Sequence, residues 1–196
     1  MLVECGFVRA TTSDGQEFTF RPSLGRIAAL GSPAEIVELY AALHGPNAAQ
    51  EAAYVLAGLC DQEDATPLVG WHDEKGWHEG LMPPQERAII ARHLMQHGIC
   101  GRARPDASEP RDRGQYSAEF KAADYIALAR VHLGMSAADA EALSMTELQQ
   151  LLDVKFPRKG GGPRDVPTRE QYEEAMRRFD EMAARRGAAP AARGQQ

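Results

Sequence analysis

The chain has 196 residues, of which 43% are hydrophobic and 26% are charged, and its formal net charge at pH 7 is −6. This composition is that of a folded protein, and the acidic balance argues against a general nucleic-acid binder, which needs a basic surface to neutralise phosphates. No apolar run approaches the roughly 20 residues that cross a bilayer, and the first residues lack the layout of a secretory signal. We therefore expect a cytoplasmic protein that binds neither nucleic acid nor membrane.

The N-terminal residues predict a β-hairpin that opens a domain of residues 1–100. Two runs with β-branched and aromatic residues, 3–10 and 16–20, flank Asp14-Gly15, a dipeptide typical of hairpin turns. Beyond the hairpin the sequence looks helical. Ser32-Pro33-Ala34-Glu35 predicts a helix start, because serine caps, proline fits the first turn and glutamate bonds back to the cap.

Two further helices are expected before residue 100. Asn47 is the expected cap of a helix that runs to about Cys60. Pro83-Pro84 opens another helix that runs through His97 and stops at Gly98. Between them, residues 61–82 lack a clear period, so they are expected to form a long loop, with a small hairpin as the alternative.

A second part of the chain follows a charged, Pro- and Gly-containing segment, 101–115, which predicts a solvated linker. Residues 116–156 then predict a helical module. Ser117 is the expected cap of its first helix, and Gly134 is the expected left-handed stop. One face of that helix is expected to combine four apolar residues: Phe120, Ala123, Ala127 and Val131.

Two short capped helices complete the module. Ser136 with Asp139, and Ser144 with Glu147, have the spacing of N-terminal caps. The expected buried side of these helices consists of leucines: Leu143, Leu148, Leu151 and Leu152. The module therefore offers a defined shape and no reactive groups.

The C-terminal part predicts a tethered helix. Residues 157–167 form a Gly- and Pro-rich linker, 168–186 an amphipathic helix, and 187–196 a disordered tail. The apolar residues of this helix include Tyr172, Met176, Phe179 and Met182. Such a helix can dock on its own domain or lie in a groove of a partner, and the sequence leaves both open. The fold class is thus mainly α: an N-terminal hairpin, a multi-helix bundle and a tethered amphipathic helix.

Candidate metal ligands are few. His93 and His97 have the i, i+4 spacing of zinc ligands on one helix face, and Cys100 follows three residues later. The chain has three widely spaced cysteines and no CxxC pair, so reduced thiols are expected. A metal-stabilised protein or small metalloenzyme remains an alternative, and the leading expectation is that no metal or cofactor is bound.

Each candidate catalytic motif in the sequence lacks a residue that the motif requires. His78-Glu79 begins like the HExxH zinc-peptidase motif, but Met82 stands where the second histidine belongs. The glycines at 160–162 lack the Lys-Ser/Thr ending of a phosphate loop. No Ser-His-Asp or Cys-His set can be singled out. We expect a protein that is not an enzyme.

The module contains a pattern that resembles a known family. The stretch DYIALARVHLGMSAADAEALSMTELQQLLDVKF (124–156) is similar to the tail assembly chaperones of long-tailed bacteriophages, siphophages and Mu-like prophages included. Those proteins often have a helix that ends in Leu-Gly, as at 133–134, followed by the pattern ls..ea..lt..el..ll, which residues 136–152 match. The segment 18–45 also looks like the opening of small phage tail-region proteins.

The resemblance implies a chaperone that coats the tape-measure protein in the host cytoplasm, helps to bring tail-tube subunits to it, and is absent from the mature virion. The expected contact residues lie on the helices of the second half of the chain: Phe120, Val131, Leu143, Leu148, Leu151, Leu152, Tyr172, Met176, Phe179 and Met182. A structural tail-region protein, such as a connector or terminator, is the alternative.

Overall fold

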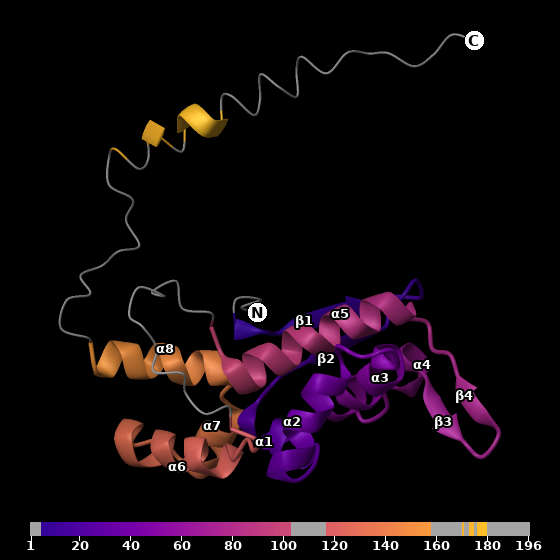
Figure 1. Ribbon diagram of the computed structural model, residues 1–196, viewed down its shortest axis with the longest axis horizontal. Coiled ribbons are helices and arrows are strands. Elements are labelled where there is room, and N and C mark those ends of the chain that lie inside the picture. Colours follow the sequence, from indigo (N-terminus) through magenta and orange to yellow (C-terminus); the bar gives the residue numbers. More distant parts are fainter. Residues whose placement is uncertain (1–4, 103–116, 158–169, 171–172, 175, 180–196) are drawn as a thin grey trace. The chain divides into compact units, whose positions relative to one another are not determined.

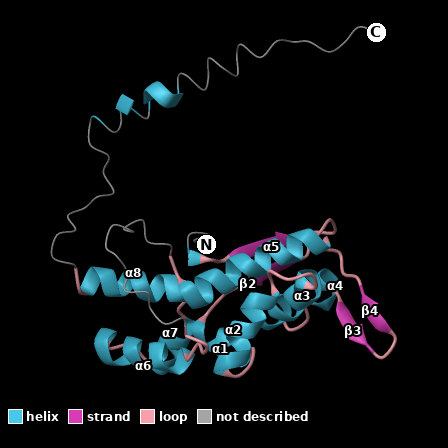
Figure 2. Ribbon diagram, viewed as in Figure 1, coloured by secondary structure: helices cyan, strands magenta, loops and turns pink. Residues whose placement is uncertain are grey.

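The computed structural model of the chain (Figure 1) describes residues 5–102, 117–157, 170, 173–174 and 176–179. The described chain is mainly α, with two small antiparallel strand pairs (Figure 2). Contacts between residues divide it into a unit of residues 1–156 and a unit of residues 157–196. Nearly all of the two predicted linkers, and all of the predicted tail, lie outside the described residues.

The N-terminal strands β1 (Val8–Thr11) and β2 (Glu17–Phe20) pair antiparallel. The turn between them contains Gly15 at φ +86°, a conformation that glycine adopts without strain. Phe18 and Phe20 of β2 have no exposed surface, so one face of the hairpin belongs to the hydrophobic core.

Helices follow the hairpin in close succession. Their bounds, with those of the second strand pair, are α1 (Leu24–Ala29), α2 (Pro33–Ala42), α3 (Ala48–Leu59), α4 (Thr66–Val69), β3 (Trp71–Asp73), β4 (Gly76–His78), α5 (Pro84–Met95) and the π-helical turn η2 (Gln96–Cys100). The helices α3 and α5 pack against each other at the centre of the unit. Leu56 of α3 and Leu94 of α5 are completely buried there.

Two of the predicted helix starts, at Ser32 and Asn47, are at the predicted positions, but only Ser32 forms the capping hydrogen bond. Ser32 accepts from the Glu35 amide, and the Glu35 carboxylate accepts from the Ser32 amide, so the predicted capping box at the start of α2 is confirmed. Asn47 precedes α3 as predicted, but its side chain makes no capping hydrogen bond.

Residues 61–82 contain more structure than a loop. Helix α4 and the β3–β4 hairpin lie within this segment, so the small-hairpin alternative is the correct one. Gly98 does not stop the following helix, because the chain continues through η2 and turns only at Gly101, with φ +76°. Gly98 instead packs closely, since an added Cβ would lie 2.7 Å from Cδ1 of Ile27.

The second half of the unit consists of α6 (Ala122–Leu133), α7 (Ala137–Ala142) and α8 (Met145–Lys155). The prediction that Ser117 caps the first of these helices is wrong. The Ser117 hydroxyl forms a local turn with Glu119, accepting from its amide at 3.3 Å and donating to its carbonyl at 2.6 Å. Gly134 ends α6 at φ +71°, as predicted.

The later start of α6 changes its buried face. The predicted face is not the buried one: Phe120 precedes the helix and is buried, whereas Val131 is 77% exposed. The helix buries Ala122 and Ala129 instead. Small residues on that side let α6 approach α1 closely, as the contacts between these helices show.

The residues on both sides of the predicted 101–115 linker share one core. The helices α6 and α7 pack on α1, and α8 packs on η2. Backbone hydrogen bonds join the halves, from the Leu24 amide to the Leu143 carbonyl at 2.7 Å and from the Phe120 amide to the Pro33 carbonyl at 2.8 Å. The helices 122–155 are therefore an integral part of the first unit.

The second unit is described at a few helical positions. Within it, Arg178 forms an i, i+4 ion pair with Glu174 at 2.6 Å, while Met176 and Phe179 are 42% and 61% exposed. Over the described ranges, no helix has the length and apolarity needed to span a membrane.

Candidate protein-binding surface

The candidate metal ligands come together only in part. The His93 and His97 rings are neighbours, with centroids 4.6 Å apart, and Cys100 is exposed at the end of η2. Nδ1 of His97 lies 2.8 Å from the Thr146 hydroxyl, which gives that nitrogen a protein partner. Within the described ranges, no three His, Cys, Asp or Glu side chains are placed to hold a metal ion.

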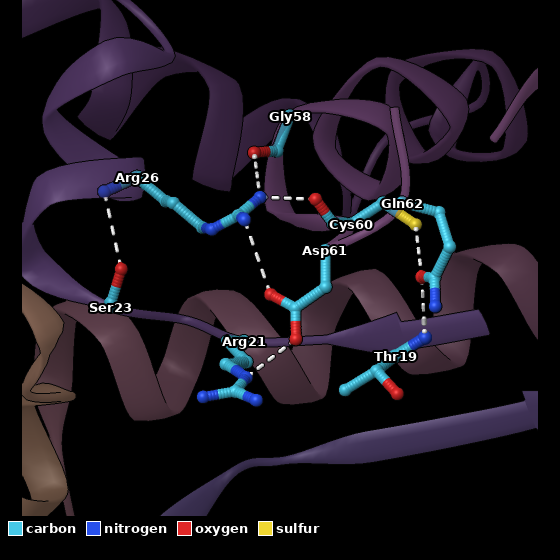
Figure 3. A network of polar contacts seen from close by, with 8 residues as sticks. All are labelled: Thr19, Arg21, Ser23, Arg26, Gly58, Cys60, Asp61 and Gln62. Atoms are coloured by element: carbon cyan, nitrogen blue, oxygen red, sulfur yellow. Dashed lines mark hydrogen bonds and ion pairs between the residues drawn. The ribbon is translucent and has the colours of Figure 1, made fainter. Parts of the chain in front are cut away.

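A polar network joins the hairpin to the helical core (Figure 3). Asp61 accepts from Arg21 Nε at 2.6 Å and pairs with Arg26 Nη2 at 3.1 Å. Arg26 also donates to the carbonyls of Gly58 and Cys60 at the end of α3. A cation at this position complements the negative end of the helix dipole, so the network closes α3 and fixes β2 beside it.

Gln62 completes this junction in Figure 3. Its Oε1 accepts from the Thr19 amide at 2.9 Å and from the Cys60 thiol at 3.2 Å. Burial raises the pKa of Cys60 above its ordinary value, so this thiol stays protonated and is a poor nucleophile. The arrangement is structural: every group in it binds another group of the same chain.

A buried arginine, Arg87, holds the β3–β4 hairpin against α5. Arg87 is 1% exposed, donates to the Val69 carbonyl at 2.7 Å and pairs with Glu79 at 2.7 Å. Its guanidinium lies 5.0 Å from the centroid of the Trp77 ring, within cation–π range. Helical periodicity does not predict this buried arginine, because charged residues in a helix are normally expected in solvent.

One shallow pocket of about 310 Å³ opens beside the start of α6. Its lining consists of Ser117, Glu119, Lys121, Asp124, Tyr125 and Leu128. Lys121 and Glu119 already pair at 3.0 Å. The Ser117 hydroxyl donates to the Glu119 carbonyl, so the polar groups of these lining residues are already engaged with the same chain.

The predicted contact residues of the first unit separate into three groups. Phe120 and Leu148 are 5% and 1% exposed and belong to the core. Leu143 and Leu152 are partly buried against it. Val131 and Leu151 are exposed, and Leu151 retains 40% of its surface. In the second unit Met176 and Phe179 are exposed, while Tyr172 and Met182 lie outside the described residues.

Exposed apolar side chains occur near the C-terminal ends of both α6 and α8. Val154 and Phe156 are 81% and 52% exposed, and the Phe156 ring meets His132 of α6 edge-on with centroids 6.0 Å apart. Figure 1 shows these two helix ends side by side. We call these two helix ends the apolar end and define it by five residues, of which His132 and Phe156 are in ring contact: Val131, His132, Leu151, Val154 and Phe156.

Sequence reasoning missed Val154 and Phe156. The signal was the run Leu151-Leu152-Asp153-Val154-Lys155-Phe156, which has more apolar residues than one buried helix face can use. Because Leu148 and Met145 fill the buried face of α8, the surplus must lie on the outside. Large side chains exposed in a group, rather than singly, are typical of binding surfaces.

Comparison with known protein families identifies a family to which most of the chain is similar. Residues 45–174 match the model of a family of unknown function, DUF6246. The chain belongs to the DUF6246 family. No curated protein and no solved structure matches it.

The DUF6246 match places the apolar end within the family region, because 45–174 runs from α3 to the described part of the second unit. The contacts of Arg87 with Glu79 and Val69 lie within the same range. The N-terminal hairpin, α1 and α2 precede it. The family region is therefore the part of the chain that contains both the central helix pair and the apolar end.

Proposed function

We propose that this DUF6246 protein acts by binding another protein, as a phage tail assembly chaperone that keeps the tape-measure protein soluble in the host cytoplasm. The observation that carries the proposal is the apolar end. It lies within residues 124–156, the segment that resembles the tail assembly chaperones, and the described residues around it offer no catalytic set.

The physical task fits such a surface. A very long helical protein with apolar stripes aggregates until its faces are covered, and apolar side chains on a stable scaffold can cover them without chemistry. The scaffold here is well fixed, since Ser144 and Glu147 form a capping box and Ser136 caps α7. A pre-organised surface loses little conformational entropy when it binds.

The described residues of the second unit supply a further apolar contact. Met176 and Phe179 are exposed on a helical segment. They are three residues apart, which places them on one face of a helix. We include them in the proposed contact set, with tail-tube subunits as a second class of partner.

Co-expression with the tape-measure protein of the same phage or prophage tests the proposal. The wild-type chain is expected to raise the soluble fraction of that partner and to co-purify with it. The double variant Val154→Asp/Phe156→Asp is expected to lose both effects, because two carboxylates would have to be desolvated at the contact. Ile89→Asp is the matched control, since Ile89 is an exposed apolar residue on α5, 62% exposed and outside the apolar end.

Two outcomes would contradict the proposal. Equal losses in the Ile89→Asp control would show that the apolar end has no special role. Mass spectrometry of purified virions supplies the second check, because a chaperone is absent from the particle. A stoichiometric presence there would favour the structural tail-region alternative.

A further inference from the structure

The β3–β4 hairpin has two faces, because side chains alternate across a strand. Trp77 belongs to the inner face, which contacts Arg87 of α5. Trp71 lies opposite His78 in the register, and these two residues with Asp73 form the other face, which we call the outer face. Figure 1 shows the hairpin at the edge of the first unit, beside α4.

The inner face shows how this hairpin holds a guanidinium. The Arg87 guanidinium lies 5.0 Å from the centroid of the Trp77 ring, and its Nη2 lies 2.7 Å from a carboxylate oxygen of Glu79. An indole ring attracts a cation over its face, and a carboxylate accepts hydrogen bonds from the cation and balances its charge. An indole and a carboxylate two positions apart in the chain therefore form an arginine site in this protein.

The outer face has the same two groups without an arginine. Trp71 is 43% exposed, and its ring stacks on that of His78 with centroids 4.7 Å apart and planes 9° apart. Asp73, two positions after Trp71, lies 2.9 Å from Nε2 of His78, and its side chain is 41% exposed. Among the described residues, no arginine or lysine lies over the Trp71 ring. The stack orients this ring, so a ligand that covers it costs little conformational entropy.

Asp73 is a charged group that can accept a further donor. Its Oδ1 accepts from the Lys75 amide at 2.7 Å, and its Oδ2 contacts His78. The Lys75 amide first, and then the hydrogen bond with His78, lowers the pKa of Asp73 below its ordinary value. An ionised carboxylate has about four acceptor sites, so these two contacts leave others open. The N–H fork of a guanidinium can reach them.

The charge around the hairpin favours a cationic partner. The hairpin and the residues next to it, 71–81, contain more carboxylates than cations: Asp73, Glu74 and Glu79 against Lys75. Neither the preceding segment 61–70 nor the following segment 82–86 contains a lysine or arginine, whereas both contain carboxylates. Arg87, the next residue, is already paired on the inner face. A local excess of negative charge attracts a positive partner and disfavours an acidic one.

We propose that the outer face of the β3–β4 hairpin binds an arginine side chain of a partner protein, with the guanidinium over the Trp71 ring and paired with Asp73. A planar guanidinium suits this face better than the compact ammonium of lysine, because it can stack on the indole while its fork binds the carboxylate. The outer face and the apolar end have no residue in common, so this inference is independent of the proposed chaperone function.

Nuclear magnetic resonance of the full-length protein tests the arginine site, because the chain has two tryptophans and each gives one indole N–H signal. The probe is the peptide acetyl-Gly-Arg-Gly-amide. Its matched control contains citrulline, which has the shape of arginine without the charge. At about pH 7.5, where histidines of ordinary pKa are mostly neutral, the arginine peptide should shift the Trp71 signal with millimolar affinity. The Trp77 signal should stay in place, since that ring already faces Arg87.

Substitutions separate the contributions of ring and charge. Trp71→Phe removes one of the two indole signals and so assigns them. Asp73→Asn should weaken binding of the arginine peptide about three-fold, because the amide oxygen can still accept from Lys75 but the charge is gone. An unchanged Trp77 signal in this variant shows that the hairpin is intact. Glu38→Gln, at an exposed position on α2, is the matched control and should bind like the wild type.

Three results would overturn the proposal. Equal shifts with the citrulline peptide would show that the outer face does not recognise the charge. A Trp71 signal that stays in place up to the solubility limit of the arginine peptide would show that the face binds no guanidinium. Unchanged affinity in Asp73→Asn would remove the carboxylate from the site. The comparison of the two peptides uses the wild-type chain and so decides the matter even if Asp73→Asn disturbs the hairpin.

Discussion

The helix pairs α3–α5 and α6–α8 contain similar apolar residues, but the first pair buries most of them in the core and the second pair leaves several of them exposed. In α3, the buried set Ala48, Ala52, Ala53, Val55, Leu56 and Leu59 leaves Tyr54 as the exposed large residue, and its hydroxyl donates to the Leu30 carbonyl. In α8, Leu148 is buried while Val154 is almost fully exposed. Apolar content alone therefore does not separate a core helix from a binding surface. The difference is whether other residues of the same chain pack over the apolar side chains and bury them.

The two regions also differ in how they are held. The α3–α5 region is fixed by charged groups, through Asp61 with two arginines and through Arg87 with Glu79. The contact of α8 with η2 uses neutral amide, hydroxyl and imidazole groups. The central helices are therefore fixed partly by ion pairs, whereas α8 is held by neutral hydrogen bonds and by the buried side chains of Met145 and Leu148.

The largest difference between the regions is expected for leucine truncation. Leu56→Ala should lower the free energy of unfolding by about 3 kcal/mol, because it leaves a cavity in a completely buried site. Leu151→Ala should cost under about 1 kcal/mol, since that side chain is 40% exposed. Urea unfolding followed by circular dichroism measures both. Equal costs would show that the apolar end is part of the core.

The second-largest effect on stability is expected when the counter-charge of Arg87 is removed. Glu79→Gln should destabilise the fold by about 1 to 2 kcal/mol, because a guanidinium with 1% exposure loses its counter-charge. Trp77 fluorescence should shift as its cation contact loosens. Glu74→Gln, an exposed position on the same hairpin, is the control and should stay near zero. If Glu79→Gln leaves the free energy of unfolding unchanged, solvent already stabilises the charge of Arg87.

The start of α8 provides a third test. Ser144→Ala should cost about 1 kcal/mol, because the Glu147 amide loses its acceptor at the helix start. Ser144→Thr retains a hydroxyl and should recover most of that loss. Thermal unfolding of the three proteins measures the order. If alanine and threonine behave alike, the capping hydrogen bond does not stabilise α8.

The smallest effect on stability is expected at the apolar end. Val154→Ser should change the free energy of unfolding by no more than about 0.5 kcal/mol, because the side chain is 81% exposed. The same substitution should reduce co-purification of the tape-measure protein. Chemical unfolding and pull-down on one preparation separate the two readouts. A large loss of stability would show that Val154 supports the fold and does not belong to the proposed binding surface.

Local signals in the sequence predicted local structure well. The capping boxes at Ser32 and Ser144 and the left-handed stop at Gly134 are present, because each depends on residues within a few positions of one another. Ser117 shows the limit of that reasoning, because its hydroxyl binds Glu119 in a local turn and α6 begins only at Ala122. A cap-forming residue therefore does not by itself fix where a helix begins.

The sequence by itself determined the helix-rich composition and the capped helix starts at Ser32, Ser136 and Ser144. Only the tertiary structure decided which apolar side chains are covered, because burial depends on neighbours far away in the chain. His97 meets Thr146 across 49 positions, and Arg87 meets Val69 across 18. Short-range periodicity contains no information about such pairings, and the apolar end is what remains uncovered within the described first unit once they have formed.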